Sequence, residues 1–390
     1  MSNKNMRDFL NTCPGLVGRI AKYIHSQLPF DQPSIALSAS LTLMGFILSR
    51  RVCANHGSFV TEPCIFSCVV ADTGSGKTTA HNIIYELLEM SGHDMSPMGC
   101  LLGMPASDSG MLSALVVNSK RLYLYDEMGI GLAALAKSKA AHEAQILSTT
   151  MKVFSASGKK YIGKEYSKDA RRDIQEPFLS ILGASTPNRF FGALSKDFID
   201  DGFLPRFLLF FELGDLRDNM PTIDYNERHH IVDELIKIQN WPKTKGNLSS
   251  TINSAAIKQV AQFRAREQAW CFDTYTEWCS NKKQELSKSL SGSTHRVFLS
   301  RAIEQCTKLC LAFCEMDSKN CVFISDESIR YCCELIDYIT QTSIRQCERF
   351  IFEDNKIKAE SELKGAILAF IRSKGESGAT KKQLCQHLDN

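Results

Sequence analysis

The sequence predicts an α/β fold built on a parallel sheet, with helices before the sheet and an all-helical region after it. Three observations predict this class. Short apolar runs typical of buried strands alternate with helical patterns, the first run leads into a glycine-rich loop and a helix, and strand patterns stop near residue 225. At 390 residues, the chain has room for two or three domains with hydrophobic cores.

The composition is that of an ordinary globular protein. Hydrophobic residues make up 44% of the chain, and the formal net charge of +3 is too small to indicate nucleic-acid binding by itself. A nucleic-acid surface must therefore come from a local cluster of basic residues. None of the 15 cysteines belongs to a C-x-x-C pair, which suits a reducing, cytoplasmic compartment.

Two stretches have competing interpretations. Cys306, Cys310 and Cys314 recur every four residues, a spacing that could hold a metal ion but favours small buried side chains on one helix face. The apolar stretch 35–49 has 15 residues and contains three serines and a threonine, whereas a membrane span needs about 20 mainly apolar residues. We expect a buried helix there and no membrane association, and the N-terminus shows no signal-peptide pattern.

The first elements are helices followed by strands. Residues 1–60 are expected to form an N-terminal helical region, interrupted by Pro29 and Pro33. Residues 61–220 form the core that contains the sheet. Its strands are expected at "CIFSCVV" (64–70), "RLYLYD" (121–126), "FLSILGAS" (178–185) and "RFLLFFE" (206–212).

The rest of the chain reads as helical. Residues 221–352 carry long helical patterns and form a helical lid domain, whose last helix ends near Phe352. Residues 353–390 begin with the charged linker "EDNKIKAESE" and continue as a helix, a turn and a second helix capped by Thr380. That order is the start of a winged helix.

The loop after the first strand is a phosphate-binding motif. Ala71, Gly76, Lys77 and Thr78 meet the pattern [A/G]-x-x-x-x-G-K-[S/T], between a strand and a helix as the motif requires. Lys77 is expected to reach the β- and γ-phosphates of ATP, and Thr78 to ligate Mg²⁺. The predicted nucleotide-binding residues are Asp72, Thr73, Gly74, Ser75, Gly76, Lys77, Thr78 and Thr79.

Acidic residues end the second strand. In "LYDEMG", Asp126 is expected to hold Mg²⁺ and Glu127 to orient or deprotonate the attacking water. A water activator indicates an ATP-hydrolysing enzyme, because a small-molecule kinase needs an acceptor site instead. A kinase is the weakest alternative.

The third and fourth strands add polar candidates. Thr186 and Asn188, in "GASTPNRF", could contact the γ-phosphate and the lytic water, although Thr-Pro-Asn is also good turn chemistry. Arg206, at the start of the fourth strand, is expected to act on the nucleotide of a neighbouring subunit; otherwise it is a surface arginine. Arg301, in the lid domain, is a candidate second arginine sensor that contributes to nucleotide binding.

A basic segment lies between the second and third strands. Basic residues with interleaved tyrosines suit a nucleic-acid backbone, although a charge run is usually a solvated face. The predicted DNA-binding residues are Lys159, Lys160, Lys164, Lys168, Arg171 and Arg172.

The order of these motifs resembles that of a family of phage, plasmid and mobile-element P-loop ATPases of formerly unknown function. It is carried by "PSIALSASLTLMGFILSRRV", "VVADTGSGKTT", "LYDEMG", "PFLSILGASTPNRF" and "DGFLPRFLLF", over roughly residues 25–315. Members of that family are associated with primases and look like replicative helicases. The "ASTPN", "LPRF" and "SRAIEQCTKLCLAF" motifs are more distantly similar to those of minichromosome-maintenance AAA+ ring helicases.

The resemblance implies an AAA+-like P-loop NTPase fold and a function. It implies an ATP- and Mg²⁺-dependent DNA helicase or translocase, assembled as a hexameric ring on single-stranded or forked DNA. A separate primase or polymerase is an implied partner, and the bacterial or phage-infected cytoplasm an implied location. The alternative is an ATP-gated initiator or loader that binds DNA and switches without unwinding it. The sensor position of the minichromosome-maintenance class, which has asparagine, holds Thr186 here.

Overall fold

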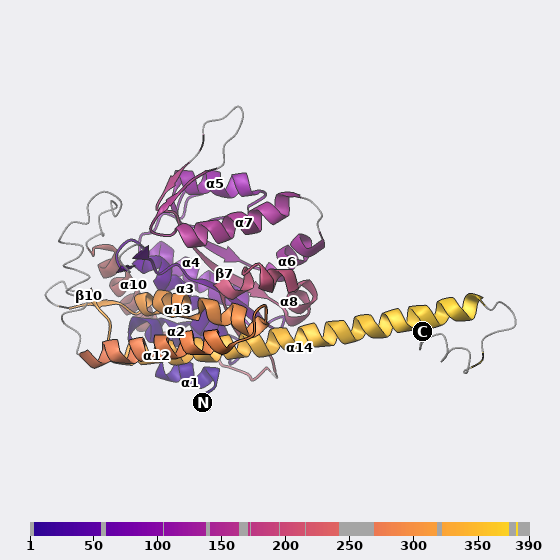
Figure 1. The fold of residues 1–390 in the computed structure, drawn as a ribbon. Helices are drawn as coiled ribbons and strands as arrows, with labels where there is room; N and C mark the ends of the chain where they lie inside the picture. The colour runs from indigo at the N-terminus through magenta and orange to yellow at the C-terminus, as the bar shows by residue number, and fades with distance from the viewer. Residues whose placement is uncertain are drawn as a thin grey trace. The chain divides into compact units, whose positions relative to one another are not determined.

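The computed structural model describes residues 4–55, 60–103, 105–137, 141–163, 171, 173–194, 196–214, 216–241, 269–317, 322–373 and 380. The chain divides into two compact units, residues 1–343 and residues 344–390. All the sheet and site residues below belong to the first unit. Figure 1 shows the order of the elements.

A four-stranded parallel sheet forms the centre of the described part of the first unit, in the order β4-β7-β3-β8. The strands are β3 (Phe66–Ala71), β4 (Lys120–Tyr125), β7 (Phe178–Ser185) and β8 (Phe207–Glu212). An isolated parallel bridge between Leu101 and Leu122 continues the sheet beyond β4. The predicted α/β fold with a parallel sheet is confirmed, and all four strands form where the apolar runs predict them.

Helices cover both faces of this sheet. Ser67 shares a hydrogen bond with Thr42 of α3 (Pro33–Leu48), and the adjacent Phe66 packs its ring against Phe154 of α7 (Ala141–Ala156), 4.7 Å between centroids. Because adjacent strand residues point to opposite faces, α3 and α7 lie on opposite sides of the sheet. Burial on both sides explains why the strands are continuous apolar runs.

The N-terminal region is helical, as expected. It consists of α1 (Met6–Thr12), α2 (Gly15–Ser26) and α3, and every residue of α3 is buried. The apolar stretch 35–49 is therefore a core helix. Among the described helices, none is both long and apolar enough to cross a membrane.

The remaining elements of the core connect the strands. The helices are α4 (Lys77–Met90), α5 (Asp108–Val117), α6 (Met128–Lys137), α8 (Pro187–Ala193), α9 (Lys196–Asp200) and the 3₁₀ turn η1 (Leu204–Arg206). Two short antiparallel pairs join β1 (Ala54–Asn55) to β2 (Val60–Thr61) and β5 (Lys160–Tyr161) to β6 (Ile174–Gln175).

After the sheet the described chain is mainly helical. It contains α10 (Tyr225–Gln239), α12 (Ala269–Lys288), α13 (Thr294–Ala312) and α14 (Asp326–Ser373). One short hairpin, β9 (Glu315–Met316) with β10 (Val322–Phe323), interrupts the region that we expected to be all-helical.

The predicted break near Phe352 is wrong. The charged segment "EDNKIKAESE" belongs to the continuous helix α14, because it has no proline or glycine and is rich in good helix formers. Apart from Thr380, the residues of the predicted second helix of the winged helix lie outside the described residues. The four-domain division stays a prediction.

Candidate active site

The loop after β3 has the backbone geometry of a phosphate-binding loop. Gly74 and Gly76 have φ values of 81° and 100°, in the left-handed region that favours glycine. A Cβ atom at Gly76 would also lie 2.8 Å from Cδ of Pro29. Gly76 caps the N-terminus of α4, so the backbone N–H groups of the loop lie at the positive end of a helix dipole. This position favours the binding of an anion such as phosphate.

Lys77 opens α4 and folds over this loop. Its Nζ donates to the carbonyl oxygens of Ala71 (2.7 Å) and Asp72 (2.5 Å). Burial lowers the pKa of Lys77, while Asp126 and other nearby carboxylates oppose that shift. The ammonium therefore lies at the helix terminus where phosphate oxygens would bind.

The two predicted magnesium ligands meet across the sheet edge. Thr78 Oγ1 donates to Asp126 Oδ2 at 3.4 Å, although 48 residues separate them. Both lie at the carboxyl ends of parallel strands, where β7 alone separates β3 from β4. A hydroxyl and a carboxylate at this spacing fit Mg²⁺, which takes few protein ligands and completes its shell with water and phosphate oxygens.

Glu127 follows Asp126 in a strained conformation. Its φ is 55°, which is uncommon for a residue with a side chain, and its backbone N–H donates to Asp126 Oδ1 at 3.1 Å. Strain of this kind costs about 1–3 kcal/mol and collects at functional sites. Both carboxylates are exposed, so the Glu127 side chain is open to water.

Sequence reasoning missed the residues that place this acidic pair. A Cβ atom at Gly129 would lie 2.9 Å from the Arg189 backbone and would clash with Ser185, so glycine lets α6 approach α8. Gly183 of β7 similarly leaves room for the Met128 side chain. The only signal in the sequence is the glycine that ends "LYDEMG".

Thr186 and Asn188 lie beside the site without a defined partner. Thr186 follows β7 and is therefore between the phosphate loop and Asp126 along the sheet edge. Neither side chain makes a hydrogen bond to another described residue. Asn188 is exposed and Thr186 is half-buried. The choice of sensor residue stays open.

Arg206 lies at the opposite edge of the sheet. It precedes Phe207, which pairs with Phe66 at the start of β3, whereas the phosphate loop follows Ala71 at the other end. Five strand residues at about 3.3 Å each separate the two edges by about 16 Å, too far for one side chain to cross. Arg206 therefore cannot reach the phosphate loop of its own chain.

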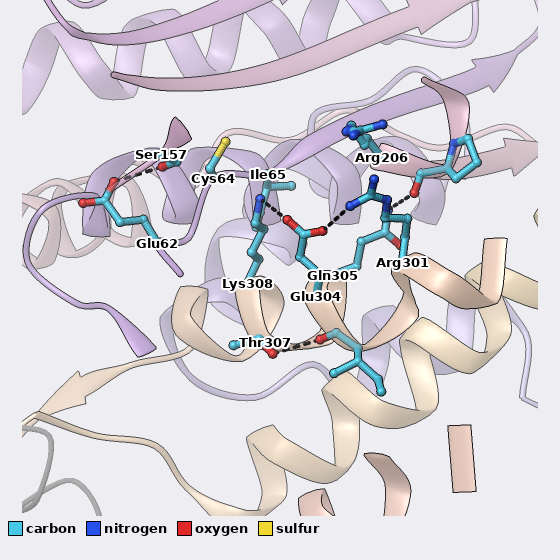
Figure 2. Close-up of polar contacts among 12 residues, drawn as sticks. Glu62, Cys64, Ile65, Ser157, Arg206, Arg301, Glu304, Gln305, Thr307 and Lys308 are labelled. Atoms are coloured by element: carbon cyan, nitrogen blue, oxygen red, sulfur yellow. Dashed lines mark hydrogen bonds and ion pairs between the residues drawn. The ribbon is translucent and has the colours of Figure 1, made fainter. Parts of the chain in front are cut away.

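Arg301 lies near Arg206, and not at the phosphate loop (Figure 2). It forms an ion pair with Glu304 at 3.0 Å. Burial lowers the pKa of Arg206, and the positive charge of Arg301 lowers it further. A groove of about 330 Å³ beside them is lined by Asp200, Asp201, Arg296 and Arg301, among others.

The basic segment begins and ends in a hairpin stem. β5 pairs with β6, and the carboxylate of Asp173 holds Lys160 (2.7 Å) and Arg171 (2.8 Å). These hydrogen bonds keep the pKa of Asp173 well below its usual range. Lys159 is also placed at the stem, and Ile162 beyond it is 66% exposed. Lys164, Lys168 and Arg172 lie outside the described residues.

The cysteines behave as core residues. Cys306 and Cys314 are buried, and Cys310 is half-buried. Among the described residues, no group of three or more histidine, cysteine or acidic side chains could hold a metal ion.

No protein-family model matches the sequence, and no curated protein matches it. Solved structures that match include one described as "SCCmec type IV Cch - active helicase", with a TM-score of 0.32 and 11% sequence identity. The match covers 86% of this chain and 51% of that chain, so this chain spans about half the length of that protein. A similarity this low does not bear on function, which must be argued from the site itself.

Proposed function

We propose that the protein hydrolyses ATP with Mg²⁺ and uses the energy to move along DNA, as a helicase or translocase. The observation that carries the ATPase assignment is the 3.4 Å contact of Thr78 with Asp126, beside Lys77 at a helix N-terminus. A hydroxyl, a carboxylate and an ammonium in this arrangement match the charges of a metal-bound triphosphate.

Each residue of this edge has a role. Lys77 and the loop N–H groups bind the phosphates, and Thr78 and Asp126 hold the metal, which offsets charge on the phosphate oxygens. Glu127 accepts a proton from the attacking water, because its carboxylate is next to Asp126 and open to solvent. Thr186 or Asn188 would orient that water.

We further propose that the active site is shared between subunits of a ring, with a hexamer as the expected form. Arg206 and Arg301 lie together at the edge that their own nucleotide cannot reach. A head-to-tail contact would present them to the phosphate loop of the next subunit, and such contacts close into rings. There they would stabilise charge on the transferred phosphoryl group.

The hairpin is the proposed contact with single-stranded or forked DNA. Its stem is fixed by Asp173, which leaves the segment between residues 163 and 171 to carry the DNA contacts. We place this activity in replication of a phage or mobile element, in the cytoplasm of a bacterial host, with priming supplied by another chain.

Mixing two inactive variants tests the shared site. Lys77→Ala and Arg206→Ala should each lose ATP hydrolysis. A ring assembled from equal amounts of the two variants should regain activity at about a quarter of its interfaces. At those interfaces an intact Lys77 faces an intact Arg206. Native mass measurement shows whether a ring contains both variants. If such mixed rings do not recover ATP hydrolysis, Arg206 does not act on the nucleotide of the neighbouring subunit.

DNA dependence separates a motor from a switch. A motor should hydrolyse ATP faster with single-stranded DNA and should displace an annealed strand. Binding without strand displacement would favour the initiator or loader. A monomer whose ATPase ignores DNA would contradict the ring motor.

A further inference from the structure

One face of α7 contacts three charged groups from distant parts of the chain. Met151 Sδ accepts from Arg206 Nη1 at 3.5 Å, the ring of Phe154 lies under the Lys308 ammonium, and Ser157, just beyond the helix, donates to Glu62 at 3.1 Å. The three α7-side positions are spaced three residues apart, so they share one side of the helix. α7 leads directly into β5 of the basic hairpin.

Lys308 is the least expected of these charged groups. It is only 4% exposed, and its ammonium lies 3.1 Å from the centre of the Phe154 ring. Within the described residues, Nζ has no well-aligned hydrogen bond, and its nearest anion is Glu304 Oε1 at 3.2 Å. Burying an ammonium this way costs free energy, so a role in solubility or simple packing does not account for it.

Glu304 connects Lys308 to the arginines. Its carboxylate bridges Arg301 and Lys308, which lie one turn either side of it on α13 (Figure 2). Arg206 and Lys308 line the same small pocket. In this described cluster, Arg301 and Lys308 form ion pairs with Glu304, whose negative charge also acts on the nearby Arg206. An anion that binds Arg206 or Arg301 would therefore change the forces on Lys308 directly.

Gln305 ties the same helix to the loop that carries Arg206. Its Nε2 donates to the carbonyl oxygen of Pro205 at 2.9 Å, and the residue is buried. α13 thus holds the arginine loop through Gln305 and contacts α7 through Lys308. These two contacts lie one turn apart on one helix.

We propose that Lys308 is a positioning residue that couples the arginine pair to α7, and through α7 to the base of the hairpin. Its ammonium sits between Glu304 and the Phe154 ring, so a shift of Arg301 and Glu304 on meeting a neighbour's phosphates moves α7. This coupling rests on the proposed function, since it links hydrolysis at one interface to the DNA-contacting segment of the same subunit.

The variants are chosen to keep the fold. Lys308→Met keeps the apolar stem and leaves Glu304 paired with Arg301. Lys308→Arg restores the charge, and Phe154→Leu removes the ring from the other side of the same contact. The matched control is Lys283→Met, at an exposed lysine on α12.

The first measurement is amide hydrogen exchange without DNA. Lys308→Met and Phe154→Leu should speed exchange in residues 149–157 by about 3- to 30-fold, and the double variant should add little beyond either single change. Lys308→Arg and Lys283→Met should match the wild type. Unchanged exchange in α7 of the folded Lys308→Met protein would overturn the proposal, whatever the protein's activity.

The second measurement is ATPase rate with single-stranded DNA. Lys308→Met should lower the DNA-stimulated kcat by about 3- to 30-fold, with KM for ATP, basal rate and DNA affinity within about twofold of wild type. Equal losses in basal and stimulated rates would reduce Lys308 to a structural residue and overturn the coupling. A wild-type protein without DNA stimulation would instead overturn the proposed motor, and the exchange experiment would still decide the contact.

Discussion

The two edges of the sheet carry opposite charge and are organised differently. At the carboxyl edge, the charge of one lysine, Lys77, is near the carboxylates of Asp72, Asp126 and Glu127, and Thr78 contacts Asp126. At the amino edge, Arg301 and Lys308 form ion pairs with Glu304, and the carboxylate also acts on the charge of the nearby Arg206.

The difference shows what each edge lacks. The carboxyl edge has acidic groups that suit a metal ion, and a helix terminus that suits phosphate. The amino edge gathers Arg206, Arg301 and Lys308 around Glu304, beside a groove that Asp200 and Asp201 also line. Under the proposed function, the metal–nucleotide end of a second copy binds at these cations, because its charge is complementary to theirs.

The strongest way to break this comparison is Arg206→Ala. We expect kcat for ATP hydrolysis to fall by about 10³- to 10⁵-fold, the range for an arginine that acts on the transferred phosphoryl group. Binding of a fluorescent ATP analogue should stay unchanged, because Arg206 does not reach its own phosphate loop. Arg296→Ala, in the groove that Arg301 also lines, serves as the control for a general loss of positive charge near Arg206. Normal turnover by Arg206→Ala would show that the amino edge takes no part in hydrolysis.

The carboxyl edge is tested by Glu127→Gln. We expect kcat to fall by about 10²- to 10⁴-fold, the usual contribution of a general base, with ATP and Mg²⁺ still bound. Steady-state hydrolysis and equilibrium nucleotide binding separate the two effects. The exposed Glu89→Gln on α4 should behave as wild type. If Glu127→Gln hydrolyses ATP at the wild-type rate, another group activates the water.

Much of the sheet and of the acidic edge could be predicted from the sequence, because the signals are local. The phosphate loop requires glycine at Gly76 for its left-handed backbone, and the apolar runs mark strands buried on both faces. Local patterns do not give strand order. That β7 lies between β3 and β4, and so brings Asp126 to Thr78, depends on packing between segments far apart in sequence.

The amino edge could not be predicted in the same way. Glu304 and Lys308 read as ordinary exposed charges on an amphipathic helix, and only the tertiary fold brings them to Arg206 and Phe154. Two of the predicted DNA-binding cations, Lys160 and Arg171, have an internal partner in Asp173, which a charge count cannot show. The predicted helix break near residue 353 is wrong for another reason, because high charge does not prevent a helix when the residues favour one.

The hairpin contrasts with both edges, because the contact proposed for it is with DNA and should therefore depend on salt. Lys164→Ala combined with Lys168→Ala should weaken single-stranded DNA binding and reduce the slope of log affinity against log salt by about 1.4, or about 0.7 for each phosphate contact. Fluorescence anisotropy at several salt concentrations measures the slope. An unchanged slope would show that this segment is a solvated face. The control is Lys283→Ala together with Lys288→Ala, on the exposed side of α12.

The smallest expected effect concerns Glu62, a buried carboxyl on the amino edge, just before β3. Burial raises the pKa of Glu62 to about 7 from an ordinary value of 4.5, so near neutral pH it only partly offsets the cations there. As pH rises from 4.5 to about 7, the unfolded chain loses this proton while the folded protein keeps it, and stability falls. Above that pH range, the raised pKa lowers the free energy of unfolding by about 3 kcal/mol in total.

Glu62→Gln should remove this cost, because the amide oxygen can still accept the hydrogen bond from Ser157. The free energy of urea unfolding should therefore be similar for variant and wild type at pH 4.5, and higher for the variant by about 2–3 kcal/mol at pH 8. Glu89→Gln, exposed on α4, should show no pH-dependent difference. A constant offset for Glu62→Gln across this pH range would mean that Glu62 is ionised in the folded protein, and that the amino edge has a second carboxylate to balance its arginines.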